Sequence, residues 1–314
     1  MNPLAAARQI DLFHGSPLTI ISSCLRGMIC AAPGHDLLAA DYSNIEGRGL
    51  AWLAGEERKL QVFRDSDAGT GPDPYLVAAA RAYNVDVKTL TKKSPERQPG
   101  KVMELAFGYQ GGVGAWRKME AAAPGMPKFT DDQVQEFKTA WRALHPKIEK
   151  FWYDLEEAAA EAVRMPGTVT KVGVISFRVK GSFLWCRLPS GRVLCYPYPK
   201  IKPIETPWGE VKDQVHYMHV DGLSNKWIET HTYGGKLAEN VTQAICRDLL
   251  AYSIRQAEEA GYPVVLHVHD EVVSEVPKGF GSLEEFESIC ARTPAWADGL
   301  PVVTEGWRGE RYRK

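Results

Sequence analysis

Three consecutive polar residues, His269, Asp270 and Glu271, stand between two apolar runs near the end of the chain. The runs at 264–268 and 272–276 are rich in β-branched residues, so they predict two strands joined by a tight turn. Two adjacent carboxylates at such a turn concentrate negative charge, and a bound divalent cation relieves that repulsion. A plain solvated acidic turn is the alternative interpretation of this tripeptide when it is considered alone.

A second acidic strand end lies far upstream, within residues 37–48. An apolar strand is expected to end at Asp41, and an amphipathic helix that Ser43 or Asn44 could cap follows it. By itself, Asp41 fits a helix start as well as it fits a metal ligand. If the two predicted strands are neighbours in one sheet, Asp41 and Asp270 form a carboxylate pair. Such a pair can hold two Mg²⁺ ions for in-line displacement at phosphorus.

A cationic cluster lies between the two acidic ones, where Arg97, Lys101, Leu105 and Tyr109 follow one another at intervals of four. Residues so spaced share one face of a helix, which is predicted over 95–109 with a proline in its first turn. Two cations with an aromatic ring further along the same face suit a triphosphate and the base attached to it. An ordinary solvated basic face is the alternative for this spacing alone.

In this order, the three clusters resemble the motifs of the polymerase domain of family A DNA polymerases (the DNA polymerase I family), and they look most like phage and prophage members. Residues 41–48, with the sequence Asp-Tyr-Ser-Asn-Ile-Glu-Gly-Arg, resemble motif A of that family. Motif B, an Arg-x3-Lys pair with a later Tyr, matches Arg97, Lys101 and Tyr109, and motif C is the tripeptide at 269–271. The resemblance covers nearly all of the chain, from about residue 25 to the C-terminus.

The resemblance implies a role for each matched acidic residue. Asp41 and Asp270 would hold the two Mg²⁺ ions, with the Tyr42 main-chain carbonyl as a further ligand. Glu271 would lie beside them as an accessory acid. Glu46 would pack under the sugar of the nucleotide and reject a 2′-hydroxyl.

It also implies roles in substrate binding. Arg97 and Lys101 would grip the triphosphate of the incoming dNTP, and Lys101 is a candidate proton donor to pyrophosphate. Tyr109 would mark the template-base end of the motif B helix, and His269 would lie near the primer terminus. Two residues of the predicted helix before motif C would contact the nascent base pair, namely Asn240 and Gln243.

Family members have a thumb and usually an exonuclease-like domain before the palm, whereas only forty residues precede Asp41 here. The chain is therefore expected to comprise palm and fingers only, and to be a fragment, half of a split polymerase or a minimal enzyme. The expected partners are primer–template DNA and dNTP. A thumb- or exonuclease-bearing protein, or self-association, would add to the grip on DNA.

The residue pattern predicts an α+β protein: an antiparallel palm sheet flanked by helices, a mainly helical fingers insertion, and a β-rich segment before the final palm helix. The expected parts are the first palm segment at 1–56, the fingers at 57–165, the β-rich segment at 166–231 and the second palm segment at 232–314. A strand followed by a helix is predicted over 36–55, further helices at 74–83, 95–109, 131–144, 146–163 and 237–259, and further strands at 168–170, 174–177, 192–194 and 215–220. The first 23 residues predict a helix and a turn.

Composition is consistent with a folded protein, because 314 residues with 44% hydrophobic and 25% charged side chains can build one large or two modest cores. No apolar run reaches the length of a membrane span, so no membrane partner is expected. The six cysteines form no CxxC pair, which indicates reduced thiols in a cytoplasmic protein. If the chain is of phage origin, this is the cytoplasm of the bacterial host. The net charge of −1 is not the basic footprint typical of nucleic-acid binders, which predicts weak affinity for DNA.

Other functions stay open at this point. The chain could be a non-catalytic or partner-dependent module that binds primer–template or nucleotide within a split replicase, or a two-metal nuclease built on the same acidic pair. His267 and His269 could suggest zinc, but no second pair with ligand spacing follows them. Trp141, Trp152 and Tyr153 lie in predicted helices and are assigned to the core rather than to base stacking.

Overall fold

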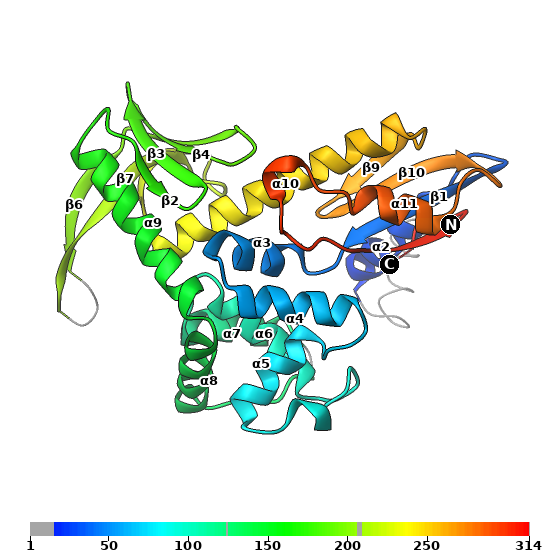
Figure 1. Ribbon diagram of the computed structural model, residues 1–314, viewed down its shortest axis with the longest axis horizontal. Helices are drawn as coiled ribbons and strands as arrows, with labels where there is room; N and C mark the ends of the chain where they lie inside the picture. Colours follow the sequence, from blue (N-terminus) through cyan, green and yellow to red (C-terminus); the bar gives the residue numbers. More distant parts are fainter. Residues whose placement is uncertain (1–15, 124, 206–208, 314) are drawn as a thin grey trace. The chain divides into compact units, whose positions relative to one another are not determined.

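The computed structural model describes residues 16–123, 125–205 and 209–313, and these form two compact units. The first unit comprises the described residues up to Ser43, Leu250–Arg292 and the described residues from Val303 onward. The second comprises Asn44–Leu249 and Thr293–Val302. Both are drawn in Figure 1.

The first unit is built on a four-stranded antiparallel sheet with the strand order β11-β1-β10-β9. Its strands are β1 (His35–Tyr42), β9 (Val264–Val268), β10 (Glu271–Pro277) and β11 (Thr304–Gly309). Residues 37–40 of β1 are buried on both faces of the sheet, which explains why this strand is a continuous apolar run rather than an alternating one.

Two of the helices in the first unit pack against this sheet at the end of β1. The first unit contains α2 (Pro17–Cys24), η1 (Arg26–Met28), α11 (Leu283–Cys290) and the last part of α10 (Gly234–Glu259). The Tyr42 hydroxyl shares a buried hydrogen bond with Ser253 on α10 and donates to the Cys290 carbonyl of α11 at 3.2 Å. The end of β1 is therefore tied to both helices.

The second unit begins with helices. They are α3 (Ile45–Ala54), α4 (Glu57–Asp67), α5 (Pro74–Tyr83), η2 (Val87–Thr89), α6 (Arg97–Phe107), α7 (Val113–Ala121), α8 (Asp131–Leu144), α9 (Pro146–Arg164), η3 (Ala295–Ala297) and the first part of α10. Two of them start at strong caps: Asp73 accepts from the Tyr75 amide before α5, and Thr130 and Gln133 form a reciprocal capping box on α8.

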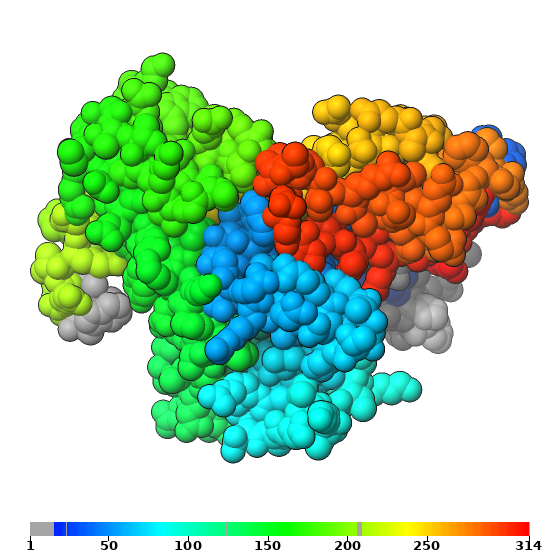
Figure 2. Space-filling view, viewed as in Figure 1, coloured from blue at the N-terminus to red at the C-terminus, as the bar shows by residue number. Residues whose placement is uncertain are grey.

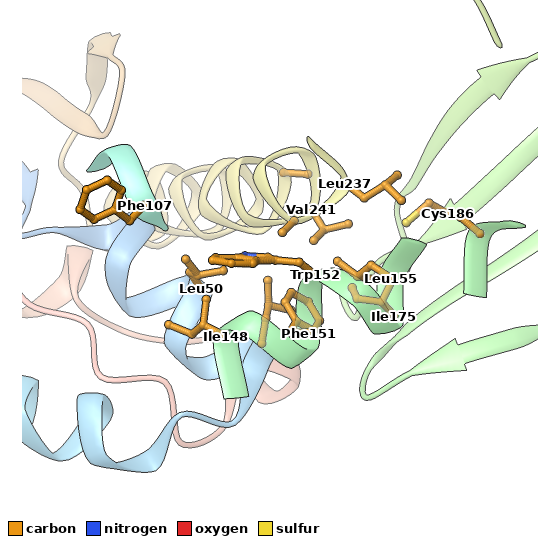
Figure 3. Packing of buried hydrophobic residues seen from close by; sticks show 14 of the residues in the cluster. Leu50, Phe107, Ile148, Phe151, Trp152, Leu155, Ile175, Cys186, Leu237 and Val241 are labelled. Carbon is orange, nitrogen blue, oxygen red and sulfur yellow. The ribbon is translucent and has the colours of Figure 1, made fainter. Parts of the chain in front are cut away.

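The core of the second unit gathers around Trp152 of α9 (Figure 3). The indole stacks on Trp141 with ring centroids 6.1 Å apart, and its Nε1 donates to the Gly108 carbonyl at 2.9 Å. Leu237 and Val241 of α10 complete this cluster on the side of the helix that faces it (Figure 3). As expected, Trp141 and Trp152 are core residues, whereas Tyr153 is 50% exposed and its assignment to the core was wrong.

Two small antiparallel sheets follow α9 in the chain, and α9 lies against β2, β3 and β7 (Figure 1). The first has the strand order β2-β3-β4-β5 and the second β6-β7-β8. Their strands are β2 (Thr170–Val172), β3 (Ile175–Lys180), β4 (Phe183–Arg187), β5 (Val193–Pro197), β6 (Lys200–Glu205), β7 (Val211–Val220) and β8 (Trp227–Thr232). The predicted fold class, α+β with antiparallel sheets, a helical segment and a β-rich segment before α10, is confirmed.

Some local predictions were right and others were wrong. The helices at 74–83 and 131–144 match α5 and α8 residue for residue. The strands β4, β6, β8 and β11 were missed, and β11 is an edge strand with two glycines, a composition that weakens the sequence signal. Of the segment 1–23, for which a helix and a turn were predicted, residues 1–15 lie outside the described residues and α2 begins at Pro17.

The helix predicted over 95–109 ends earlier than expected, because α6 stops at Phe107 and Tyr109 lies in the following turn. Gln110 has a φ of 64°, a left-handed conformation that an α-helix cannot continue through. The turn then brings Gly111 against the chain, where a Cβ would lie 2.0 Å from the Ala106 carbonyl oxygen. Only glycine fits there.

The predicted cap of the helix after Asp41 was also only partly right. Asn44 does precede α3, but its φ of 49° is left-handed and its side chain makes no capping hydrogen bond. The side chain instead lies over Gly47, where a Cβ would approach Asn44 Oδ1 to 2.5 Å. Within the described residues, no helix is both long and apolar enough to cross a lipid bilayer.

A buried ion pair holds α6 within the second unit. Lys59 of α4 contacts Glu104 of α6, with side chains 4% and 7% exposed. Trp141 Nε1 donates to Glu104 Oε1 at 3.1 Å, and His145 Nε2 lies 3.5 Å from the same oxygen. Burial alone would raise the pKa of Glu104, but the Lys59 ammonium and the His145 ring outweigh it and lower that pKa to about 2.

This pair predicts a pH-dependent stability. The folded pKa of Glu104 lies below the unfolded value of 4.5, so its stabilisation is present above about pH 4.5 and is lost as the pH falls toward 2. Glu104→Gln should lower the free energy of unfolding at pH 7 by about 3–5 kcal/mol, because Lys59 stays buried without its partner. It should also flatten the decline between pH 5 and 2, as measured by denaturant unfolding at a series of pH values.

Glu57→Gln is the matched control, because Glu57 pairs with Arg64 at the surface, where its side chain is 64% exposed. It should leave both the free energy of unfolding and its pH dependence nearly unchanged. If the free energy of unfolding fell equally steeply between pH 5 and 2 in the wild type and in Glu104→Gln, Glu104 would not be the source of the pH dependence.

Candidate active site

The end of β1 carries Asp41 between two other strands. Asp41 is opposite Glu271 of β10 on one side and opposite Glu305 of β11 on the other. The Tyr42 amide then donates to the Asp270 carbonyl at 3.2 Å. The condition set by the sequence, that the two acidic strands be neighbours in one sheet, is therefore met within the first unit.

The turn between β9 and β10 consists of His269 and Asp270, which is a two-residue connection. His269 has a φ of 53°, a left-handed conformation that is uncommon for a residue other than glycine. Its side chain is exposed and Asp270 is half-buried, whereas Glu271 is only 1% exposed. The three motif C residues thus occupy three different environments within one tight turn.

Glu271 is held from the C-terminal end of the chain. The Tyr312 hydroxyl donates to Glu271 Oε1, and both side chains are buried. Burial and the neighbouring Glu271 carboxylate raise the pKa of Tyr312 to about 12, so this hydroxyl keeps its proton and remains a donor at neutral pH. The Tyr312 ring packs against Trp307 with centroids 5.6 Å apart. Neither Tyr312 nor Glu305 was anticipated from the sequence, since both reach the site only through the missed strand β11 and the segment after it.

The donor chemistry of this sheet edge suits a hard divalent cation. Asp41 and Asp270 offer carboxylate oxygens, and Tyr42 follows Asp41 with a main-chain carbonyl. Mg²⁺ typically binds proteins through one or two carboxylates and completes its shell with water and substrate phosphates. In the part of the chain that the structure describes, no group of three or more His, Cys, Asp or Glu side chains forms a metal cage, and a two-carboxylate site needs none.

The predicted triphosphate residues lie on α6 in the second unit. Arg97 binds Asp73 Oδ2 through Nε at 3.0 Å and Nη2 at 2.8 Å, and its guanidinium lies over the Tyr75 ring. Lys101 is exposed and Leu105 is 38% exposed on the outer side of the helix. Asp73 was not anticipated as a partner of Arg97, because an Asp-Pro pair before a helix signals only a cap.

Glu46 and Tyr109 come together in the same unit. The Tyr109 hydroxyl donates to Glu46 Oε2 at 3.2 Å, which links the first turn of α3 to the turn after α6. Burial and the Glu46 carboxylate raise the pKa of Tyr109 well above 10, so the hydroxyl remains a donor. The turn also packs tightly on the start of α10, where a Cβ on Gly235 would lie 2.2 Å from the Tyr109 carbonyl oxygen.

The remaining predicted residues lie on α10. Asn240 Nδ2 donates to the Tyr196 hydroxyl at 3.1 Å, and Gln243 is exposed. The structure thus groups the predicted residues into two sets. One set, at the sheet edge of the first unit, is Asp41, Tyr42, His269, Asp270 and Glu271, and the other, in the second unit, is Glu46, Arg97, Lys101, Tyr109, Asn240 and Gln243.

The Tyr312–Glu271 bond predicts a measurable loss of stability. Tyr312→Phe removes the donor to a buried carboxylate and should lower the free energy of unfolding by about 1–3 kcal/mol. Tyr153→Phe, at a half-exposed position on α9, is the control and should have almost no effect. Denaturant unfolding measures both. If Tyr312→Phe cost as much in a Glu271→Gln background as in the wild type, the two side chains would not be coupled.

No protein-family model matches the chain, but individual polymerases do. It is 40% identical over 307 residues to a DNA polymerase of Bacillus phage SP02, covering 97% of this chain and 45% of that protein. It is 31% identical over 116 residues to a DNA polymerase of Mycobacterium phage D29, covering 36% of this chain and 18% of that protein. It is also 24% identical over 265 residues to the thermostable DNA polymerase I of Thermus filiformis, covering 83% of this chain and 25% of that protein.

The chain therefore spans less than half the length of these relatives. Among solved structures, it is similar to the POL domain of Pol1 from M. smegmatis, which was solved in complex with DNA primer-template and dNTP. That likeness has a TM-score of 0.56 at 17% identity and covers 91% of this chain and 42% of the other, so it concerns the fold alone. The similarity to the phage SP02 DNA polymerase runs along almost the whole chain and, with the similarity to a DNA polymerase I, supports the predicted resemblance to phage-like members of the family A DNA polymerases.

Proposed function

We propose that the chain is the catalytic core of a template-directed DNA polymerase that adds dNTPs to a primer 3′ end by nucleotidyl transfer. The observation that carries the proposal is the acidic sheet edge, where Asp41 lies opposite Glu271 and the Tyr42 amide binds the Asp270 carbonyl. Similarity to a phage DNA polymerase along almost the whole chain supports it, as does the order of the three motifs.

The carboxylates of Asp41 and Asp270 and the Tyr42 carbonyl would hold two Mg²⁺ ions. When bound, such ions activate the attacking 3′-hydroxyl and stabilise the charge on the leaving pyrophosphate. Glu271 acts beside them as an accessory acid, and its bond to Tyr312 fixes the start of β10, directly after Asp270. His269, exposed in its left-handed turn, contacts the primer terminus.

The second set of residues binds the nucleotide. Arg97 and Lys101 bind the triphosphate, and Lys101 donates a proton to the leaving pyrophosphate. Arg97 is paired with Asp73 in this structure, so triphosphate binding exchanges one anionic partner for another.

Glu46 and Tyr109 act together on the sugar and base. Glu46 packs against the sugar and excludes a 2′-hydroxyl, and the Tyr109 hydroxyl holds its carboxylate in place. Asn240 and Gln243 contact the nascent base pair from α10. On this assignment residues 57–165 are the fingers, and the segments 1–56 and 232–314 contribute the palm.

A partner-dependent role is the second candidate, in which the chain is a module that binds primer–template or nucleotide within a split replicase. Primer extension by the chain alone separates the two roles, since a partner-dependent module extends only when its partner is added. Loss of labelled primer without dNTP would instead indicate a nuclease.

The two-carboxylate assignment predicts that Asp41→Asn or Asp270→Asn abolishes primer extension. An amide binds Mg²⁺ poorly, so the variant loses several kcal/mol of the charge stabilisation that the metal supplies. Because each step of about 1.4 kcal/mol changes the rate tenfold, the rate should fall by roughly a thousandfold or more. Asp154→Asn on α9 makes the same chemical change at a surface ion pair with Lys150 and should leave the rate unchanged. Near wild-type extension by either variant would exclude the assignment, provided circular dichroism shows both to be folded.

The sugar contact predicts altered nucleotide selection. Glu46→Ala opens the space beside the 2′-carbon and should raise ribonucleotide incorporation, relative to deoxyribonucleotide, by about tenfold, the value of a small steric contact. Tyr109→Phe keeps the carboxylate but removes its hydrogen bond, so the same ratio should rise by a smaller factor. Single-nucleotide insertion with dNTP and with rNTP measures both. If the ratio of ribonucleotide to deoxyribonucleotide incorporation did not change, Glu46 would have no role in sugar selection.

A further inference from the structure

One face of the sheet β2-β3-β4-β5 carries side chains that the proposed polymerase chemistry does not use. Strand alternation directs Ile175, Phe177, Leu184 and Cys186 into the core, and all four are buried (Figure 3 shows Ile175 and Cys186). The residues between them point to the other side. That side, called here the cationic–aromatic face, consists of Lys171, Arg178, Lys180, Phe183, Trp185 and Arg187.

Rings and cations alternate on this face by strand register. Arg178 is directly opposite Trp185, and Lys180 is directly opposite Phe183. Directly opposed side chains in antiparallel strands project from the same face as close neighbours. Each ring therefore has a cation beside it.

The two rings form a preset surface. The Phe183 and Trp185 centroids are 5.3 Å apart with the rings tilted by 41°, and Trp185 Nε1 donates to the Lys180 carbonyl at 3.2 Å. The hydrogen bond fixes the indole, which leaves its ring face as a platform. An open hollow of about 640 Å³ lies over this region, lined by Arg178, Trp185 and Arg187 among others. Figure 2 shows the green atoms of this segment at the molecular surface.

The charge of the face is of one sign. None of the four strands contains an Asp or a Glu. Across the described residues, the four cations of the face form no ion pair, in contrast to Lys200 and Lys202 on the neighbouring sheet, which both pair with Glu229. Cations gathered on one face without a carboxylate are suited to an anionic partner from outside.

We propose that the cationic–aromatic face binds single-stranded DNA, with bases stacked on Trp185 and Phe183 and phosphates held by Arg178, Lys180 and Arg187. Proteins that bind single strands without sequence preference combine these two features, stacking rings and a basic track. A duplex hides the faces of its bases from such rings, and a second copy of the same face would oppose cation to cation. The inference deepens the proposed function, since a polymerase handles a single-stranded template, but it requires no catalysis.

The test is binding of a fluorescently labelled oligo-dT to the full chain, followed by anisotropy without dNTP or Mg²⁺. Trp185→Ala should weaken binding by about tenfold, since stacking on one ring contributes about 1–3 kcal/mol per base. Trp227→Ala removes an equally large ring, 51% exposed on β8, and should leave the affinity unchanged. Equal losses in the two variants, or none in Trp185→Ala, would overturn the proposal.

Salt dependence tests the phosphate contacts separately. For single strands, the slope of log K against log salt is about −0.7 per neutralised phosphate, so Arg178→Ala with Arg187→Ala should reduce its magnitude by about 1.4. Lys200→Ala with Lys202→Ala removes the same charge from paired positions and should not change the slope. An unchanged slope in the first double variant would place the DNA elsewhere.

Two further readouts separate this inference from the proposed function. Photocrosslinking of an oligomer that carries 5-iododeoxyuridine should label Trp185 or Phe183, and labelling confined to other residues would contradict the proposal. A wild-type chain that binds oligo-dT but does not extend primers would refute catalysis and leave the DNA-binding face standing. Primer extension by a chain that does not bind oligo-dT would refute the DNA-binding face alone. Tighter binding of blunt duplex than of oligo-dT would overturn the single-strand assignment.

Discussion

Everything proposed for the first unit depends on the antiparallel register of β1 and β10. Side chains alternate between the two faces of a sheet, so a slip of one residue would turn Asp41 to the face that Tyr42 now occupies. The hydrophobic residues prevent this slip, because Leu37 and Ala39 must pack with Val273 on one face. Tyr42 adds a second constraint on the other face through its contacts with Ser253 and Cys290. The position of the acidic residues is thus set by apolar packing.

The second unit uses a different means to place its proposed nucleotide residues. Its helix α6 is amphipathic, with Met103 and Phe107 in the core and Lys101 outside. The buried Lys59–Glu104 pair fixes the rotation of this helix, since turning the helix would separate two buried opposite charges. Arg97 and Lys101 therefore project from a helix whose orientation is set by one buried charge pair as well as by hydrophobic contacts.

Local sequence patterns predicted the elements that carry strong signals. The strands around motif C are β-branched, α5 starts with Asp-Pro, and α8 starts with a Thr-x-x-Gln capping box, so each could be identified within a few residues. The end of α6 could not, because the left-handed Gln110 is imposed by packing of the turn. The partners of the proposed site residues were equally out of reach. Tyr312 lies 41 residues from Glu271 and Asp73 lies 24 residues from Arg97, and a local pattern holds no information about such pairs.

The first unit is assembled from segments that lie far apart in the sequence, and this affects how the chain folds as it is synthesised. The central strand β1 is made before the second unit, but its neighbours β10 and β11 are more than two hundred residues further along the chain. Domains generally fold in the order in which they emerge from the ribosome. The second unit, which is nearly continuous in sequence, can therefore form while β1 still exposes two unpaired edges of an apolar strand. The acidic sheet edge is then completed only when the segment ending at Tyr312 has left the ribosome, so the proposed metal site forms after the second unit.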